Sequence, residues 1–377
     1  MKFTINSGDF NAKLNLLSKV QNAKQSIQIL DCVKIDLNAD TITMTACDGE
    51  NTVITSMPVT EAEDVNQSIC VRLSLLSNAL REVPNQPITF TANDQTLEVT
   101  ISYLSGKFNF VGQDASQFPD IRKELTNANQ FTMPANTLLS GLQTTKESMA
   151  DDELRPIMNG TYCDFQANGD VVFVSSDGHR LTRNTYRNIC PGMQQPFGFV
   201  LSRKASWLLS AALAKLNDDI EVQTTDTHAT FRFADTFIYV RLREGHYPNY
   251  NSVIPKENPF TITVDRDALI STLRRILVFA NENTALVSLK IENNKIHVSA
   301  QDFDFSRSSE EYIECEGNGA DLSIGFKGTF LLNLLRLLPA GNIQLHLAND
   351  KQAGVITPAE QGEEEDLLLL LMPMMLS

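Results

Sequence analysis

Apolar residues recur along this chain with two different periods. Leu14, Leu17 and Val20 follow the spacing of one helix face. Residues 41–45 and 343–347 instead alternate between apolar and polar side chains, which is typical of a strand with one buried face. Because helical and strand-like segments alternate along the chain, the pattern predicts an α+β protein with helices packed on one face of antiparallel sheet.

One short phrase returns three times, as Phe3-Thr4-Ile5, Phe131-Thr132-Met133 and Phe260-Thr261-Ile262. After each copy the same landmarks follow in order: a helix, a strand with an acidic turn, a short apolar strand, a second helix and closing strands. Regular return of one unit predicts three copies of a single domain. The predicted helices span residues 10–25, 72–82, 134–149, 202–215, 265–279 and 327–338.

The domain boundaries are expected after the segments Gln117–Asp120 and Tyr247–Tyr250. We therefore predict domains at residues 1–122, 123–254 and 255–377. Each would have an ordinary domain size and could hold its own hydrophobic core.

Cysteine usage and the termini indicate the cellular compartment. The six cysteines are scattered without metal-ligand spacing, which favours reduced, buried thiols. Met1-Lys2 leads directly into the first strand without a signal peptide. The apolar run 367–376 contains Pro373 and is far shorter than the roughly 20 residues of a membrane span. We expect a cytoplasmic protein whose last apolar run is a buried strand.

The net charge of −15 argues against a strong nucleic-acid binder until it is mapped along the chain. The six predicted helices carry a net positive charge, so the strands and loops are more acidic than the average. Ordinary solvated helix faces remain one explanation. The other is a basic surface that meets phosphates, with these candidate residues: Lys13, Lys19, Lys24, Arg72, Arg81, Lys146, Arg203, Lys204, Lys215, Arg274, Arg275, Lys327 and Arg336.

Simple geometry favours a dimer around DNA. A domain of this length is equivalent to a sphere about 36 Å across. Three such spheres in a ring leave a hole of only about 5 Å, whereas six leave roughly 35 Å. One chain therefore cannot surround a duplex, but a head-to-tail pair with closed twofold symmetry can. Basic helices lining the hole would make sequence-independent phosphate contacts.

Several segments spread over the whole chain resemble the bacterial DNA polymerase III beta subunit family, the sliding clamps. They are the opening Met1–Thr4, the stretch Ser176–Leu181, the segment Tyr247–Tyr250 and the ending Met372–Met374. The resemblance implies DNA-clamp domains in a six-domain homodimeric ring around double-stranded DNA. It also implies no catalytic activity and no cofactor. The expected partners are the replicative DNA polymerase, an ATP-driven clamp loader and other proteins with a clamp-binding motif.

The resemblance also implies a groove that accepts a short extended peptide with apolar anchors. An adaptable apolar groove suits several partners. Met375, Ser252 and Phe330 depart from the family's usual basic residue, arginine and tyrosine, which leaves the preferred motif open. The carried-over positions are Met158, Ser176, Gly178, His179, Arg180, Leu181, Pro248, Ser252, Val253, Phe330, Leu370, Leu371, Met372, Pro373, Met374, Met375 and Leu376.

By the same resemblance, Phe108 and Phe110 on an edge strand would meet Val278 and Phe279 of a second copy. Pairing of two edges would hide exposed ladder groups. Phenylalanines two positions apart are equally typical of any half-buried strand, so both interpretations stay open.

Two other classes of function need consideration. Asp177-Gly178-His179 could belong to an acid–base or metal site with Asp48 and Asp302. These aspartates occupy equivalent positions in separate repeats, so we expect turn residues and no metal site. The remaining alternative is an acidic three-domain scaffold for protein interactions that does not encircle DNA.

Overall fold

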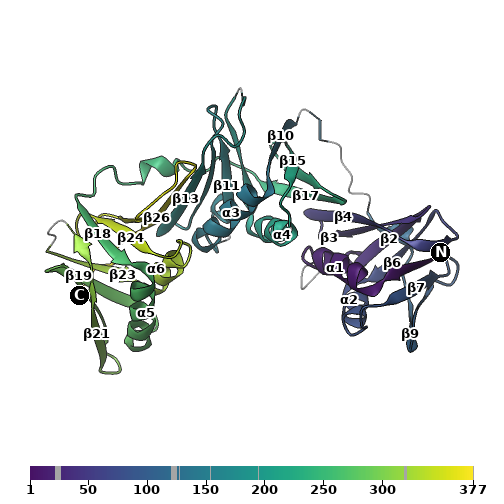
Figure 1. Ribbon diagram of the computed structural model, residues 1–377, viewed down its shortest axis with the longest axis horizontal. Helices are drawn as coiled ribbons and strands as arrows, with labels where there is room; N and C mark the ends of the chain where they lie inside the picture. Colours follow the sequence, from purple (N-terminus) through teal and green to yellow (C-terminus); the bar gives the residue numbers. More distant parts are fainter. Residues whose placement is uncertain are drawn as a thin grey trace. The chain divides into compact units, whose positions relative to one another are not determined.

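The computed structural model describes the chain except for residues 22–26, 120–124, 127, 153, 194, 318–320 and 377. Lys24 and the predicted boundary at 122 therefore lie outside the described residues. The chain divides into two compact units. The first consists of Met1–Leu139 and Trp207–Leu242, and the second of Ser140–Ser206 and Arg243–Ser377. Figure 1 gives the element labels.

The first unit contains two antiparallel sheets. One has the order β5 (Thr60–Glu63), β1 (Lys2–Asn6), β7 (Pro87–Ala92), β8 (Glu98–Tyr103), β9 (Gly106–Val111). The other has the order β10 (Asn129–Pro134), β15 (Asp219–Thr224), β16 (His228–Phe233), β17 (Thr236–Arg243), β4 (Asn51–Pro58), β3 (Thr41–Cys47), β2 (Cys32–Asn38), β6 (Gln67–Arg72).

The second unit also contains two antiparallel sheets. The larger has the order β18 (Phe260–Asp265), β24 (Asn342–Leu347), β25 (Gly354–Pro358), β26 (Glu365–Leu371), β13 (Arg180–Tyr186), β12 (Val171–Ser176), β11 (Gly160–Phe165), β14 (Phe197–Ser202). A short β22 (Glu316–Gly317) also pairs with β18. The smaller has the order β21 (Arg307–Glu314), β20 (Lys295–Asp302), β19 (Leu286–Glu292), β23 (Leu322–Lys327).

The two larger sheets repeat each other strand by strand. Each begins with a strand that carries the recurring phrase, β10 or β18, and each contains one central pair that joins successive repeats. That pair is β17 with β4 in the first unit and β26 with β13 in the second. We call these the first joined sheet and the second joined sheet. The predicted α+β architecture with repeated antiparallel sheets is confirmed.

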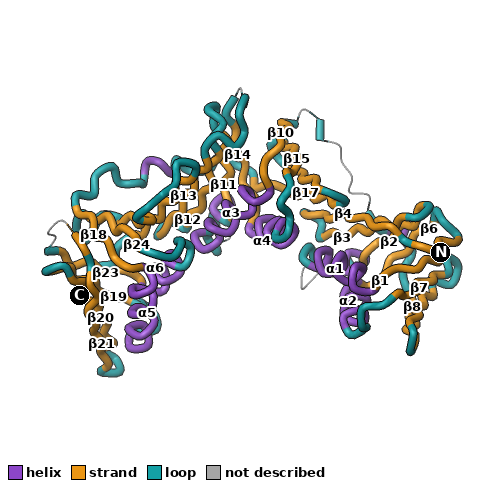
Figure 2. The backbone as a smooth tube through the Cα atoms, viewed as in Figure 1, coloured by secondary structure: helices purple, strands orange, loops and turns teal. Residues whose placement is uncertain are grey.

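Six α-helices occur in the described part of the chain, two in each repeat (Figure 2). The side chain of Asn6 accepts hydrogen bonds from the N–H groups of Gly8 and Asp9, so the first helix begins earlier than predicted. The predicted stretches 134–149 and 265–279 each end in a 3₁₀ turn, η3 (Lys146–Ser148) and η6 (Leu277–Phe279). The bounds are α1 Ser7–Ser18, α2 Leu73–Arg81, α3 Ala135–Thr145, α4 Arg203–Leu213, α5 Arg266–Ile276 and α6 Gly328–Leu335.

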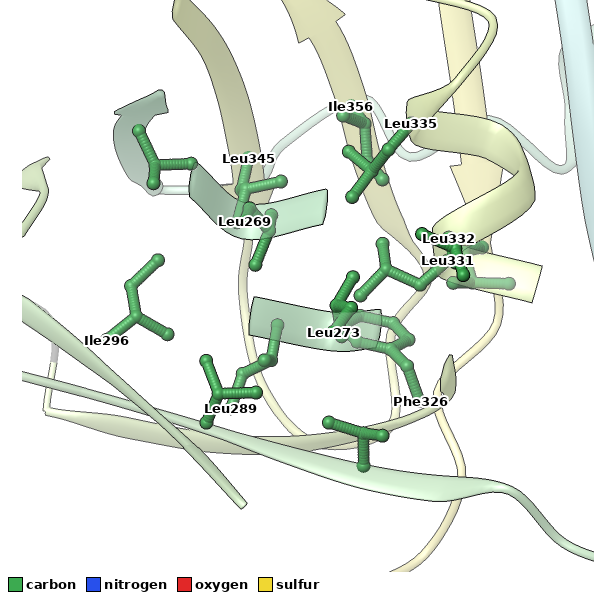
Figure 3. Close-up of a cluster of buried hydrophobic side chains, with 14 of the residues drawn as sticks. Leu269, Leu273, Leu289, Ile296, Phe326, Leu331, Leu332, Leu335, Leu345 and Ile356 are labelled. Carbon is green, nitrogen blue, oxygen red and sulfur yellow. The ribbon is translucent and has the colours of Figure 1, made fainter. Parts of the chain in front are cut away.

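The helices bury their apolar faces on the sheets. In the first unit α1 contacts α2, β3 and β4, and buries Phe10, Leu14 and Leu17. In the second unit Leu269 and Leu273 of α5 share one hydrophobic core with Leu331 of α6, and residues of both sheets contribute to it (Figure 3). Amphipathic helices on one sheet face are what the apolar spacing predicted.

The first half of the last apolar run, residues 367–371, lies in the buried strand β26, as predicted. The prediction was wrong for residues 372–376, which follow β26 and include the exposed Met372, Met375 and Leu376. The alternate side chains of β26 enter two different clusters. Leu369 and Leu371 belong to the core with α5 and α6, whereas Leu368 and Leu370 belong to a second cluster. None of the described helices reaches the length and apolar character that a membrane crossing requires.

Candidate partner-binding groove and basic surface

The turn between β12 and β13 is built by Asp177. Its Oδ1 accepts hydrogen bonds from the backbone N–H groups of His179 and Arg180 at 2.9 and 3.0 Å. Gly178 takes a φ of 90°, which an L side chain rarely adopts. Asp48 makes the same contacts to Glu50 and Asn51 in the first unit. Asp302 ends β20, and its Oδ1 accepts the N–H of Asp304 at 3.1 Å. The prediction that Asp48, Asp177 and Asp302 are turn residues is confirmed.

Arg180 connects this turn to the third repeat. Its Nε donates to Asp177 Oδ2 at 3.0 Å, and its guanidinium carbon lies 4.1 Å from the centre of the Phe330 ring. The Nζ of Lys327 lies 4.6 Å from the same ring centre. Two cations therefore rest on one half-buried aromatic ring, an arrangement that stabilises both charges beside an apolar surface.

The segment after β26 runs alongside the turn. Leu181 pairs with Leu370 across the sheet, and the N–H of Met372 donates to the carbonyl of His179 at 2.8 Å. The N–H of Met374 then donates to the carbonyl of Gly325 at 2.8 Å. A Cβ at Gly325 would come within 2.6 Å of the Met374 oxygen, so the close approach needs glycine there.

The C-terminal side chains beyond β26 remain accessible. Met375 is 87% exposed, and Met372 and Leu376 are also exposed. Pro373 and Met374 are half-buried. Flexible apolar side chains that no cluster of the described chain covers can adapt to an incoming peptide.

The connection between the second and third repeats lies against the joined sheet of the second unit. Tyr247 stacks on Tyr162 with ring centres 4.8 Å apart, and the Tyr250 hydroxyl donates to Asp164 at 2.8 Å. Burial raises the pKa of Tyr162 to about 12. Pro248, Ser252 and Val253 stay exposed on this connection.

All of the predicted groove residues belong to the second unit. Leu181 and Leu370 share an apolar cluster with Tyr250, while Arg180 contacts Phe330. Ser176 donates its hydroxyl to the carbonyl of Arg180 within the turn. Leu371 lies in the other core, so its side chain does not belong to the cluster of Leu181.

Three further residues belong to this region and were not predicted as groove residues. Arg155 Nη1 lies 4.0 Å from Met158 Sδ and near Gly178. Lys327 contacts Phe330, and Tyr250 closes the apolar cluster. The spacing of Lys327 and Phe330, three residues apart at the start of a helix, is the sequence signal that could have identified this pair.

The described candidate DNA-facing residues fall into three groups: residues with protein partners, half-buried residues and exposed residues. Lys13 forms an ion pair with Asp235 at 2.6 Å, and Arg275 with Glu311 at 2.6 Å. Arg203 Nη2 donates to the carbonyls of Met149 and Ala150. Lys204 and Lys327 are half-buried. Seven others are exposed: Lys19, Arg72, Arg81, Lys146, Lys215, Arg274 and Arg336.

The candidate interface residues lie near two sheet edges. Phe108 and Phe110 are half-buried on β9, the end strand of its sheet. Val278 and Phe279 are exposed on η6, which contacts β20 and β21. β21 is the end strand of the smaller sheet in the second unit.

The six cysteines are free and buried. Burial raises the pKa of Cys32 to about 11 and of Cys70 to about 12, so these thiols stay protonated at neutral pH. In the described chain no three His, Cys, Asp or Glu side chains are placed to hold a metal ion.

Repeated joined sheets, each backed by paired helices, define a protein of the DNA-clamp class. The chain matches the N-terminal, central and C-terminal domain models of the DNA polymerase III beta subunit over residues 1–122, 132–249 and 251–375. This chain belongs to the DNA polymerase III beta subunit family.

Individual relatives and solved structures match this chain over nearly its whole length. The beta sliding clamp of Synechococcus elongatus is 27% identical over 366 residues, which cover 95% of this chain and 96% of the relative. The Bacillus subtilis beta sliding clamp is 22% identical over 383 residues, which cover 99% of this chain and 99% of the relative. The fold matches the Pseudomonas aeruginosa DNA polymerase sliding clamp with a TM-score of 0.91 at 21% identity, covering 100% of both chains.

Proposed function

We propose that this chain is a DNA sliding clamp that encircles duplex DNA as a homodimeric ring and tethers the replicative polymerase for processive synthesis. The observation that carries this proposal is the pattern of joined sheets, combined with membership of the family. A protein made of equivalent, edge-joined repeats can continue the same joint into a second copy.

The strand order identifies the two edges that would join. β17 and β26 are the last strands of their half-sheets, and each pairs with β4 or β13 of a neighbouring repeat. In the first repeat, β9 takes the place that β17 and β26 take in the other repeats. In the third repeat, β21 takes the place that β4 and β13 take. Both β9 and β21 are end strands of their sheets. We infer that β9 of one copy pairs with β21 of the other. Phe108, Phe110, Val278 and Phe279 would lie at this joint.

Two chains would supply six domains, which leave a hole of roughly 35 Å for a duplex. The proposed domains are residues 1–122, 123–254 and 255–377. The exposed cations Lys19, Arg72, Arg81, Lys146, Lys215, Arg274 and Arg336 are the best candidates for phosphate contacts. Lys13, Arg203 and Arg275 would first have to exchange their present partners, so we expect them to contribute less.

The groove beside the Ser176–Leu181 turn would accept a partner's extended peptide. The exposed side chains of Met372, Met375 and Leu376 supply the apolar contacts above the buried cluster of Leu181 and Leu370. Arg180 with Phe330 forms one wall. The partners we propose are the replicative polymerase, the clamp loader and other proteins with a clamp-binding motif. The protein would act in the cytoplasm without catalysis and without a cofactor.

A comparison of circular with linear DNA provides the decisive experiment. Purified protein is loaded by its clamp loader with ATP onto nicked circular DNA, and the same circle is then cut once. A sliding clamp stays bound to the circle in gel filtration and is lost from the linear form. Equal retention on both forms would favour the protein-interaction scaffold instead.

The joint and the groove each need a separate test. Phe108→Lys on β9 should convert the dimer into monomers in sedimentation, while Leu104→Lys, in the exposed loop before β9, serves as the control. Met374→Ala, or removal of Leu376 and Ser377, should weaken binding of a polymerase tail peptide without dissociating the dimer. Unchanged peptide affinity would contradict the proposed groove.

A further inference from the structure

The first unit holds an open cavity of about 640 Å³ against its joined sheet. Its lining comes from β2, β3, β4, β17, the start of β6 with Asn66 before it, and the segment Ala115–Pro119. This volume is within the usual range of ligand sites. All of its lining residues belong to the first unit.

The cavity lies at the position that corresponds to the partner groove of the second unit. Thr52 pairs with Tyr239 as Leu181 pairs with Leu370. Thr45 pairs with Ile54 as Val174 pairs with Arg183. The repeat therefore presents the same stretch of sheet twice, and the segment Phe118-Pro119 stands where Tyr247-Pro248 stands in the second unit.

The side chains at these equivalent positions differ in kind. Thr43, Thr45 and Thr52 of the first unit replace Val172, Val174 and Leu181 of the second. Lys34 likewise replaces Tyr162. In the second unit the apolar side chains pack with Tyr250 and close the surface. In the first unit the polar ones leave it open.

One polar atom in the cavity lacks a partner. Thr52 is only 3% exposed, and its buried Oγ1 has no hydrogen-bond partner among the described residues. A buried hydroxyl without a partner costs about 1–3 kcal/mol. Thr52 lines the cavity, so rotation of its side chain toward the cavity would let a ligand there supply the missing hydrogen bond.

The charges in the cavity balance each other. Lys34 Nζ lies 3.0 Å from Asp36 Oδ1, and the Ser68 hydroxyl donates to the same carboxylate. Phe118, Phe237 and Tyr239 add flat apolar surface. The lining is therefore neutral, rich in hydroxyl groups and bordered by aromatic rings.

We propose that this cavity, which we call the polar groove, is a second docking site that binds an uncharged, extended peptide segment rich in Ser, Thr, Asn or Gln. The inference rests on the proposed function, because it assigns the segment to a protein held by the partner groove. The neutral lining does not select phosphate or a charged tail. Apolar side chains would cover the hydroxyl and amide groups of the lining without forming hydrogen bonds to them.

A peptide-display selection tests this proposal on the full-length protein without DNA. A random dodecapeptide library is selected on the wild type, and individual peptides are synthesised and titrated by fluorescence anisotropy. Thr52→Val removes the hydroxyl at constant shape, and Thr45→Val/Thr52→Val removes two. Met374→Ala, in the partner groove, is the matched control. Lys34→Gln provides a second variant if the double variant unfolds.

The expected result is a class of polar peptides whose Kd rises about threefold to tenfold for each lost hydroxyl. Their affinity should be unchanged by Met374→Ala. The proposal is overturned if no selected peptide responds to Thr52→Val or Lys34→Gln, or if every peptide is apolar and lost with Met374→Ala. Retention on circular DNA is measured in parallel, so failure of the clamp function is recognised separately.

Discussion

The two joined sheets share one strand order and one register but differ in the chemistry of a single surface. In the second unit Val172, Val174 and Leu181 form an apolar cluster beneath the linker. In the first unit three threonines at the equivalent positions line an open cavity. Each backbone satisfies its own hydrogen bonds through the ladder, so the side chains are free to diverge.

The comparison shows that one repeated scaffold carries two surfaces of different chemistry. The apolar version buries its strand against Tyr247 and Tyr250 and presents the exposed side chains of Met372, Met375 and Leu376. The polar version exposes hydroxyls and one ion pair. Fold and binding chemistry are therefore separable within one chain.

The largest expected effect compares Leu181→Ala with Thr52→Ala. Leu181 is 2% exposed within the apolar cluster, so its truncation should lower the free energy of unfolding by about 2–5 kcal/mol. Thr52→Ala removes an unpaired hydroxyl beside an existing cavity and should cost less than about 1 kcal/mol. Urea denaturation followed by circular dichroism measures both, and equal losses would refute the comparison.

A smaller effect concerns the carboxylates beneath the two surfaces. Asp164 accepts a hydrogen bond from Tyr250, whereas its equivalent Asp36 is held by Lys34 and Ser68. Tyr250→Phe should destabilise the protein by about 1–2 kcal/mol, because it removes a hydrogen bond to a charged group. If Tyr250→Phe leaves the thermal unfolding temperature unchanged, the hydrogen bond from Tyr250 to Asp164 contributes nothing to stability.

The binding side of the comparison is tested with Phe330→Ala. Loss of the ring that carries Arg180 and Lys327 should weaken an apolar partner peptide roughly tenfold, about 1.4 kcal/mol. Phe330→Tyr keeps the ring and should bind almost normally. Phe237→Ala in the first unit should leave this peptide unaffected. Calorimetric titration of all three variants distinguishes the two surfaces.

The smallest effect is a pH dependence limited to the second unit. Desolvation lowers the pKa of His346 below its ordinary value of 6.5, whereas the equivalent position in the first unit is the exposed Glu221. The unfolded chain then binds the proton more readily, so stability falls as the pH drops through 6.5. His346→Gln should reduce this loss between pH 7.5 and 5.5. If the urea midpoint of His346→Gln falls between pH 7.5 and 5.5 as much as that of the wild type, the pH dependence comes from another group.

Much of the architecture could be predicted from periodicity and repetition. The recurring phrase, the alternating strands and the Asp-Gly turns depend on short-range patterns, and the structure confirms them. Helix ends were less accurate, because caps such as Asn6 and the 3₁₀ turns after α3 and α5 depend on local hydrogen bonds. The groove residues came from resemblance, and their joint role stays a prediction.

The helices and strands along the chain could thus be predicted from residue types, since each kind of element imposes its period on neighbouring positions. The pairing of strands between repeats could not be predicted, because β17 and β4 pair although nearly two hundred residues of chain separate them. That pairing places Tyr239 beside Thr52 and Leu370 beside Leu181. Only the folded chain therefore reveals that one repeated surface is closed and apolar while its counterpart is open and polar.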